Sequence, residues 1–181
     1  MLNEETPTLG LMGSYRDVLR DAAGQVTWDS GWRKNTILIG CRQLLAAFMC
    51  GEANTAGIQG LQVGAGDAAW DGAVAPQPPT TGGLLDPSPY TAPLSALKFS
   101  YLDPVTGQVS TGVTSRLQIV VTLGPNMPNW PGDGIHAAAT LREFGLVGKL
   151  DNKPILLNAV RHVAIAKDPV STLVRTIQLV F

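Results

Sequence analysis

The two histidines, His136 and His162, are the side chains of this sequence best suited to bind a metal ion or to transfer a proton. Neither has a cysteine or an acidic cluster at the spacing of metal ligands, so we predict a structural role for both. Glu143 directly follows Arg142, which favours an ion pair at a strand end over a general acid. Because a G-x-S-x-G nucleophile elbow and a P-loop are also missing from the sequence, we predict no catalytic residues and no enzymatic activity.

A glycine-rich stretch suggests a nucleotide site. Gly64, Gly66 and Ala69 have the spacing of a dinucleotide fingerprint, and they follow a predicted strand. Such a site needs a helix N-terminus directly afterwards to hold the pyrophosphate. The following residues, "WDGAVAPQPP" (70–79), are too rich in proline for a helix to begin there. We therefore predict a glycine-rich strand turn and no bound cofactor.

The same stretch loosely resembles a calcium loop, because Asp67 and Asp71 carry carboxylates at alternating positions. The pattern fails at two places: Ala69 offers no side-chain oxygen, and Pro78 stands where a bidentate glutamate is required. A capped turn explains Asp67 better, and we predict no metal site.

Three aromatic residues lie in or beside loops and are predicted interface residues. Trp70 and Trp130 flank Gly- and Pro-rich segments, and Tyr90 lies inside one of them. Aromatic side chains at loop tips are typical anchors of protein interfaces. The alternative is that both tryptophans fill the ends of the protein's own core. Trp28 and Trp32 share one face of a predicted strand, and we expect both in the core.

Alternating apolar and polar residues predict a mainly β protein. A hairpin is expected over 14–21 and 25–32, turning at Gly24, and about eight to ten strands in all indicate an antiparallel β-sandwich. A single amphipathic helix is expected near 36–50, with Gly51 at its end. The further expected strands cover residues 57–66, 94–103, 107–123, 139–150, 153–169 and the C-terminal segment.

Two loops interrupt this single β-rich domain, 1–181. Residues 74–93 contain six prolines and predict a loop or an arm over a neighbouring subunit, and 124–134 predict a second exposed loop. The chain ends on the strand-like "STLVRTIQLVF" (171–181), whose last residue, Phe181, is apolar. We expect such an end to be covered by the protein's own sheet or by another subunit, which makes Phe181 the fourth predicted interface residue.

The composition also favours assembly. Apolar residues make up 45% of the chain and charged residues only 15%, below the roughly 25% of an average soluble protein. The formal net charge of −1 argues against nucleic acid or anionic membranes as partners, and a small-molecule ligand is not expected. The N-terminus lacks the pattern of a signal peptide, and no run of apolar residues is long enough for a transmembrane helix. Two cysteines, Cys41 and Cys50, are expected to be free thiols, as suits a reducing cytoplasm.

The order of several short motifs resembles that of tailed-bacteriophage virion proteins. The motifs are "YRDVLRDAAGQVTWDSGWRKNTIL" (15–38), "IQGLQVGAGDAAW" (58–70), "LREFGLVG" (141–148) and "LLNAVRHVAIAKDPVSTLVRTIQLVF" (156–181). The resemblance is to tail-associated structural subunits of the collar, fibre or baseplate kind. It implies a β-rich building block without an active site, located in the virion and assembled in the host bacterial cytoplasm. The implied partners are copies of itself and other virion structural proteins.

Three other functions are compatible with the same sequence. A capsid decoration protein would use the same kind of contacts elsewhere on the particle. A carbohydrate- or receptor-binding β-sandwich of a tail fibre would use Trp70, Tyr90 and Trp130 as stacking platforms. A small hydrolase with an unrecognised site is the third.

Overall fold

The structure is a computed structural model and describes residues 10–130 and 133–181. It is 47% strand and 11% helix, which confirms the mainly β prediction. The elements are β1 (Met12–Arg20), β2 (Val26–Asp29), β3 (Arg33–Ile37), α1 (Ile39–Cys50), β4 (Ala56–Gly64), the 3₁₀ turn η1 (Ala68–Asp71), β5 (Tyr90–Pro93), the 3₁₀ turn η2 (Leu94–Ala96), β6 (Leu97–Leu102), β7 (Val109–Ser110), β8 (Arg116–Leu123), β9 (Thr140–Leu150), β10 (Lys153–Leu156), β11 (Asn158–Ala166) and β12 (Thr172–Val180).

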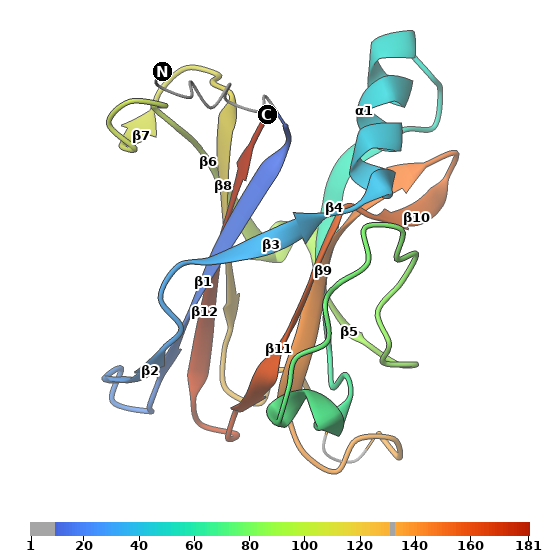
Figure 1. Ribbon diagram of the computed structural model, residues 1–181. Coiled ribbons are helices and arrows are strands. Elements are labelled where there is room, and N and C mark those ends of the chain that lie inside the picture. Colours follow the sequence, from blue (N-terminus) through green and yellow to red (C-terminus); the bar gives the residue numbers. More distant parts are fainter. Residues whose placement is uncertain (1–9, 131–132) are drawn as a thin grey trace, which may run out of the picture.

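The strands form one curled antiparallel sheet. Its order is β5-β4-β9-β11-β3-β1-β12-β8-β6-β7, with β10 added to β9 and β2 added to β1. In Figure 1 one group of strands contains β1, β12, β8 and β6, and another contains β11, β9 and β4. Strand β3 joins the two groups, because it pairs with β1 at Asn35 and with β11 at Ile37. The main core cluster combines buried residues of both groups, such as Ile119 and Phe144.

The C-terminal strand is an inner strand of this sheet. β12 pairs along its whole length with β1 on one side and with β8 on the other. Every second residue of β12 is buried, as the alternation predicts, and Arg175 occupies one of these inward positions. The protein's own sheet therefore covers this strand, whereas the covering of its terminal residue by another subunit remains a prediction. Phe181 follows β12, and its side chain is 48% exposed.

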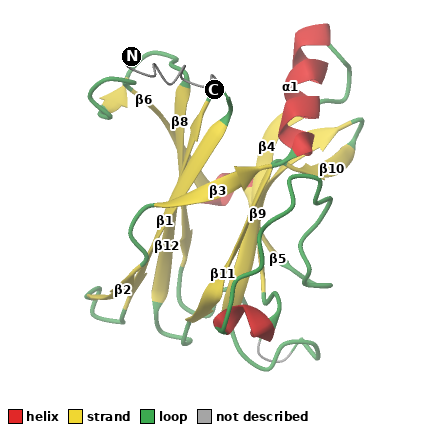
Figure 2. Ribbon diagram, in the orientation of Figure 1, coloured by secondary structure: helices red, strands yellow, loops and turns green. Residues whose placement is uncertain are grey.

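The helix is shorter than predicted and only partly covered. Residues 36 and 37 belong to β3, so α1 begins at Ile39, and Gly51 ends it with a positive φ, as predicted. Leu38, Cys41 and Leu44 are buried, whereas Phe48 is exposed and Met49 is 89% exposed. Figure 2 shows the helix beside β4 and β10, at one end of the sheet. Among the described residues, no helix is both long enough and apolar enough to cross a membrane.

Several expected elements differ in extent. The segment 107–123 divides into β7 and β8, and 153–169 divides into β10 and β11. Part of the Pro-rich segment is a strand, because β5 pairs with β4 at an edge of the sheet, where proline is tolerated. The predicted hairpin is confirmed, but the expectation that Trp28 and Trp32 fill the core is wrong, because both are exposed.

Candidate functional site: a histidine–carboxylate clamp, a buried ion pair and three clefts

Glu143 holds the Pro-rich loop against the sheet. It lies on β9, is almost fully buried, and accepts hydrogen bonds from the backbone N–H groups of Leu85 (3.0 Å) and Asp86 (2.7 Å). Burial raises the pKa of Glu143, although these two hydrogen bonds oppose the effect. Gly64 on the adjacent strand leaves room for the carboxylate, because a Cβ there would lie 2.6 Å from its Oε1.

The expected ion pair between Arg142 and Glu143 is wrong. Neighbouring residues of a strand point to opposite faces of the sheet, so these two side chains diverge. Arg142 instead donates to both carboxylate oxygens of Asp71, at 3.0 and 2.8 Å, and to the carbonyl of Ala65. The ion pair of Arg142 is therefore with Asp71, which is distant in the sequence, and not with the adjacent Glu143.

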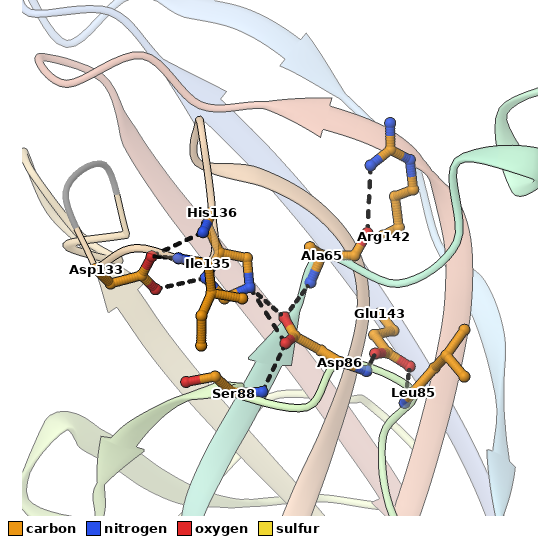
Figure 3. A network of polar contacts seen from close by, with 9 residues as sticks. All are labelled: Ala65, Leu85, Asp86, Ser88, Asp133, Ile135, His136, Arg142 and Glu143. Atoms are coloured by element: carbon orange, nitrogen blue, oxygen red, sulfur yellow. Dashed lines mark hydrogen bonds and ion pairs between the residues drawn. The ribbon is translucent and has the colours of Figure 1, made fainter.

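His136 joins the two long loops (Figure 3). Its Nδ1 lies 2.6 Å from Asp133 Oδ2, and its Nε2 lies 3.0 Å from Asp86 Oδ2. Asp86 also accepts the N–H groups of Ala65 and Ser88, at 2.7 and 2.8 Å. We call Asp86, Asp133, His136 and Glu143 the clamp, because together they fasten residues 85–88 to residues 133–136.

The charges of the clamp explain its chemistry. Burial disfavours protonation of His136, but the hydrogen bond to Asp133 and the charge of Asp86 outweigh it and raise the pKa above 6.5. Hydrogen bonds from the backbone N–H of His136 and then from its ring lower the pKa of Asp133 to about 2. Both ring nitrogens of His136 already lie against carboxylate oxygens, so neither is free to bind a metal ion. Among residues 10–130 and 133–181, no group of three or more His, Cys, Asp or Glu side chains is placed to hold a metal ion.

Two of the four predicted interface residues are buried inside the chain. Trp70 is 5% exposed and lies under the guanidinium of Arg161, whose Cζ is 5.0 Å from the ring centroid. Trp130 is 3% exposed and stacks on His136 at 4.2 Å. The expectation of tryptophans exposed at loop tips is wrong, and the alternative of tryptophans packed within the protein holds.

The other two predicted interface residues are more accessible. Tyr90 is partly buried, and its hydroxyl lies 3.9 Å from the sulfur of Met127. Trp130 belongs to the same loop as Met127, so Tyr90 and Trp130 lie on segments that meet, whereas Trp70 and Phe181 lie elsewhere. An interface role for these residues remains a prediction.

The Pro-rich segment lies against its own chain. Pro79 accepts a hydrogen bond from the backbone of Ile39, and Pro76 accepts one from Arg161. Asp67 caps the turn η1 by accepting the N–H of Ala69 at 2.9 Å, so the predicted capped turn is confirmed. The turn η1 begins at Ala68, just before residues 70–79, but it has four residues and is too short for the pyrophosphate site of the fingerprint.

A second polar group is buried between the strand groups. Arg175 donates two hydrogen bonds of 2.7 Å to Asp17, and both side chains are about 1% exposed. His162 Nε2 lies 3.3 Å from Arg175 Nη2, and the guanidinium covers the ring of Phe144 at 3.6 Å. This pair explains why an arginine occupies an inward position of β12.

The pH dependence of stability reports on this buried histidine. Burial, and then the charge of Arg175, lower the pKa of His162 to about 4. Between pH 6.5 and about 4 the unfolded chain therefore binds more protons than the folded protein, and the free energy of unfolding decreases as the pH falls through this range.

Urea unfolding curves recorded between pH 6.5 and 5 give the free energy of unfolding at each pH. We expect His162→Gln to remove the part of its decrease that His162 causes. The difference between the two proteins isolates His162 from Glu143, whose raised pKa acts in the opposite direction. If the free energy of unfolding decreased equally with pH in the native protein and in His162→Gln, the decrease could not be assigned to His162.

Several clefts lie on the surface of the described residues, and three of them are large enough to bear on function. One, of about 420 Å³, lies beside the buried ion pair and is lined by residues of β1, β2, β3 and β11. A second, of about 750 Å³, lies between residues 126–129, 137–140 and 166–169. A third, of about 340 Å³, lies between β4, β6 and β8. No protein-family model, no curated protein and no solved structure matches this chain.

Proposed function

We propose that this chain is a structural subunit of a bacteriophage particle, associated with the tail, collar or baseplate. In this proposal the curled sheet is a two-layered β-sandwich, and the Pro- and Gly-rich loops are contact segments. The subunit works through contacts with copies of itself and with other virion proteins. The motif order of the sequence supports the virion assignment, and the exposed apolar surface supports the contacts.

The observation that carries the proposal is an apolar groove on the surface. It is the cleft of about 340 Å³, and its lining residues are Ile58, Leu94, Phe99, Ser100, Tyr101 and Leu117. Phe99 and Tyr101 are 41% and 38% exposed. Apolar side chains gathered in a groove are typical of surfaces that are covered by a partner.

The strand that bears these aromatics also has an open edge. β6 pairs with β8 on one side, but β7 covers it only at Tyr101 and Leu102. Among the described residues, 97–100 have no strand partner on their second side. A strand from another subunit can hydrogen-bond to such an edge while its side chains enter the groove.

The alternative functions differ in their support. A carbohydrate- or receptor-binding sandwich loses two of its three stacking platforms, because Trp70 and Trp130 are buried within the chain. A capsid decoration protein would use the same groove, and only its position on the particle distinguishes it from a tail protein.

The virion assignment is tested on purified particles of a phage that encodes this chain. Mass spectrometry of the particles is expected to detect the chain at a fixed ratio to the other virion proteins. Immunogold labelling at the tail, collar or baseplate would support the proposal, whereas labelling of the capsid would favour decoration. A chain made during infection but missing from the particles would overturn the proposal.

The role of the groove is tested by light scattering of the purified protein. We expect the native chain to form an oligomer. Phe99→Ser/Tyr101→Ser is expected to raise its dissociation constant at least a hundredfold, because burying each aromatic side chain contributes about 2 kcal/mol. The matched control is Val105→Ser/Val113→Ser, which removes two highly exposed valines from loops outside the groove. A native chain that remains monomeric would contradict the contacts proposed here.

A further inference from the structure

The cleft of about 420 Å³ beside the buried ion pair is lined by three cationic residues and a tryptophan. Trp28 of β2, Arg33 and Lys34 of β3, and Arg161 of β11 line it. A narrower cleft of about 190 Å³ shares Lys34 and Arg161 with it and continues towards Asn35. We call the two together the cationic cleft. Its volume lies in the range of small-molecule sites.

The cationic cleft carries an uncompensated positive charge. Arg33, Lys34 and Arg161 have no ion-pair partner within residues 10–130 and 133–181, whereas Arg16, Arg142 and Arg175 each bind a carboxylate. Asp17 is the single acidic residue among those lining the cleft, and Arg175 neutralises it. Three cations around one concave site attract an anion more strongly than isolated surface cations do.

Unused hydrogen-bond groups lie along the same cleft. Arg161 Nε is buried and has no hydrogen-bond partner, although Nη1 of the same guanidinium binds the carbonyl of Pro76. The amide of Asn35 is also buried, with both Nδ2 and Oδ1 unpaired. Buried polar atoms without partners are rare in folded proteins and call for an explanation. A bound ligand with oxyanion and hydroxyl groups would supply the missing partners.

Trp28 adds an apolar wall to these polar groups. Trp28 lines the cleft and is 37% exposed to solvent. An indole face beside cations and amide groups is suited to a ring that is apolar on its face and polar at its rim. A sugar ring has this character.

We propose that the cationic cleft binds a sugar that carries an acidic group, such as a uronic acid or a sugar phosphate. The acidic group lies between Arg33 and Arg161, and the ring lies against Trp28. Lys34 follows Arg33 on β3, so its side chain leaves the strand on the other face and adds positive charge at the edge of the cleft. A nucleic acid fits less well, because it requires a basic track longer than one cleft and the chain has a net charge of −1. This site goes beyond the proposed structural function and does not depend on it.

The proposal is tested by NMR titration of the full chain with glucuronate, glucose 6-phosphate, glucose, inorganic phosphate and a triglutamate peptide. We expect the two acidic sugars to bind, to shift the indole N–H signal of Trp28, and to bind more weakly at high salt. Glucose and inorganic phosphate are each expected to bind at least tenfold more weakly, because each lacks one of the two recognised parts.

Variants locate the site. Arg33→Gln/Lys34→Gln is expected to weaken glucuronate binding at least tenfold, because charge-assisted hydrogen bonds are lost. The charge-matched control, Lys98→Gln/Lys153→Gln, changes two exposed lysines outside the cleft and is expected to bind as the native chain does. Equal weakening in both double variants would show nonspecific attraction and overturn the site. Triglutamate binding as tight as that of glucuronate would overturn the sugar assignment, and so would the absence of any binding.

Discussion

Replacement of Asp17 by asparagine is expected to lower the free energy of unfolding by about 3–5 kcal/mol. Asp17 and Arg175 are both fully buried and share two hydrogen bonds of 2.7 Å. The asparagine is neutral, so it leaves the guanidinium without a counter-charge in a place that water does not reach. Urea unfolding followed by tryptophan fluorescence measures the loss.

Two further variants separate this cause from a general sensitivity of β1. Asp29→Asn disrupts the exposed pair of Arg16 with Asp29 on the neighbouring hairpin strand, and little change is expected there because water screens exposed pairs. Asp17→Leu/Arg175→Met removes both buried charges and is expected to recover most of the lost stability. If Asp17→Asn and Asp29→Asn had equal effects, the buried pair would have no special role.

The second large effect is expected from Asp86→Ala, which should lower the free energy of unfolding by about 2–3 kcal/mol. The Asp86 carboxylate is fully buried and accepts from Ala65 N–H, Ser88 N–H and the His136 ring. Alanine leaves these donors without an acceptor, and it separates the Pro-rich loop from residues 133–136.

Amide hydrogen exchange shows whether the clamp itself has opened. Exchange at Ala65, Ser88 and His136 is expected to accelerate in Asp86→Ala more than exchange in the strands β1 and β12. Asp103→Ala is the matched control, because Asp103 also accepts backbone N–H groups, from Val105 and Thr106, but in an exposed turn. Unchanged exchange at Ser88 in Asp86→Ala would show that the loops are held by other contacts.

Local patterns in the sequence were sufficient to predict most single elements. The alternation in β4, β9 and β12 predicted strands, and Gly24 predicted the turn of the first hairpin. These predictions succeed because side-chain periodicity and glycine's access to positive φ are properties of a few adjacent residues. The helix was predicted close to its observed position, but its apolar residues Phe48 and Met49 are exposed. Periodicity shows that a face is apolar, and it does not show whether the chain covers that face.

The candidate sites could not be predicted in this way. His136 and Asp86 are 50 residues apart in the sequence, and Asp17 and Arg175 are 158 apart. No spacing rule connects residues at such separations, so His136 was assigned a structural role without a partner being named, and Glu143 was paired with its neighbour Arg142. The one available signal was Arg175 on the apolar side of its strand, which indicates a buried partner of opposite charge.

The amino-acid sequence by itself determined that this protein is mainly β, with one helix, because hydrogen-bonding geometry imposes a repeat of two residues on strands and 3.6 on helices. Only the tertiary structure decided which strands are neighbours, that β12 lies inside the sheet, and that Trp70 and Trp130 are buried. It also decided which charges meet. These features depend on contacts between distant segments, and such contacts form only where the whole chain can bury its apolar surface and satisfy its buried polar groups together.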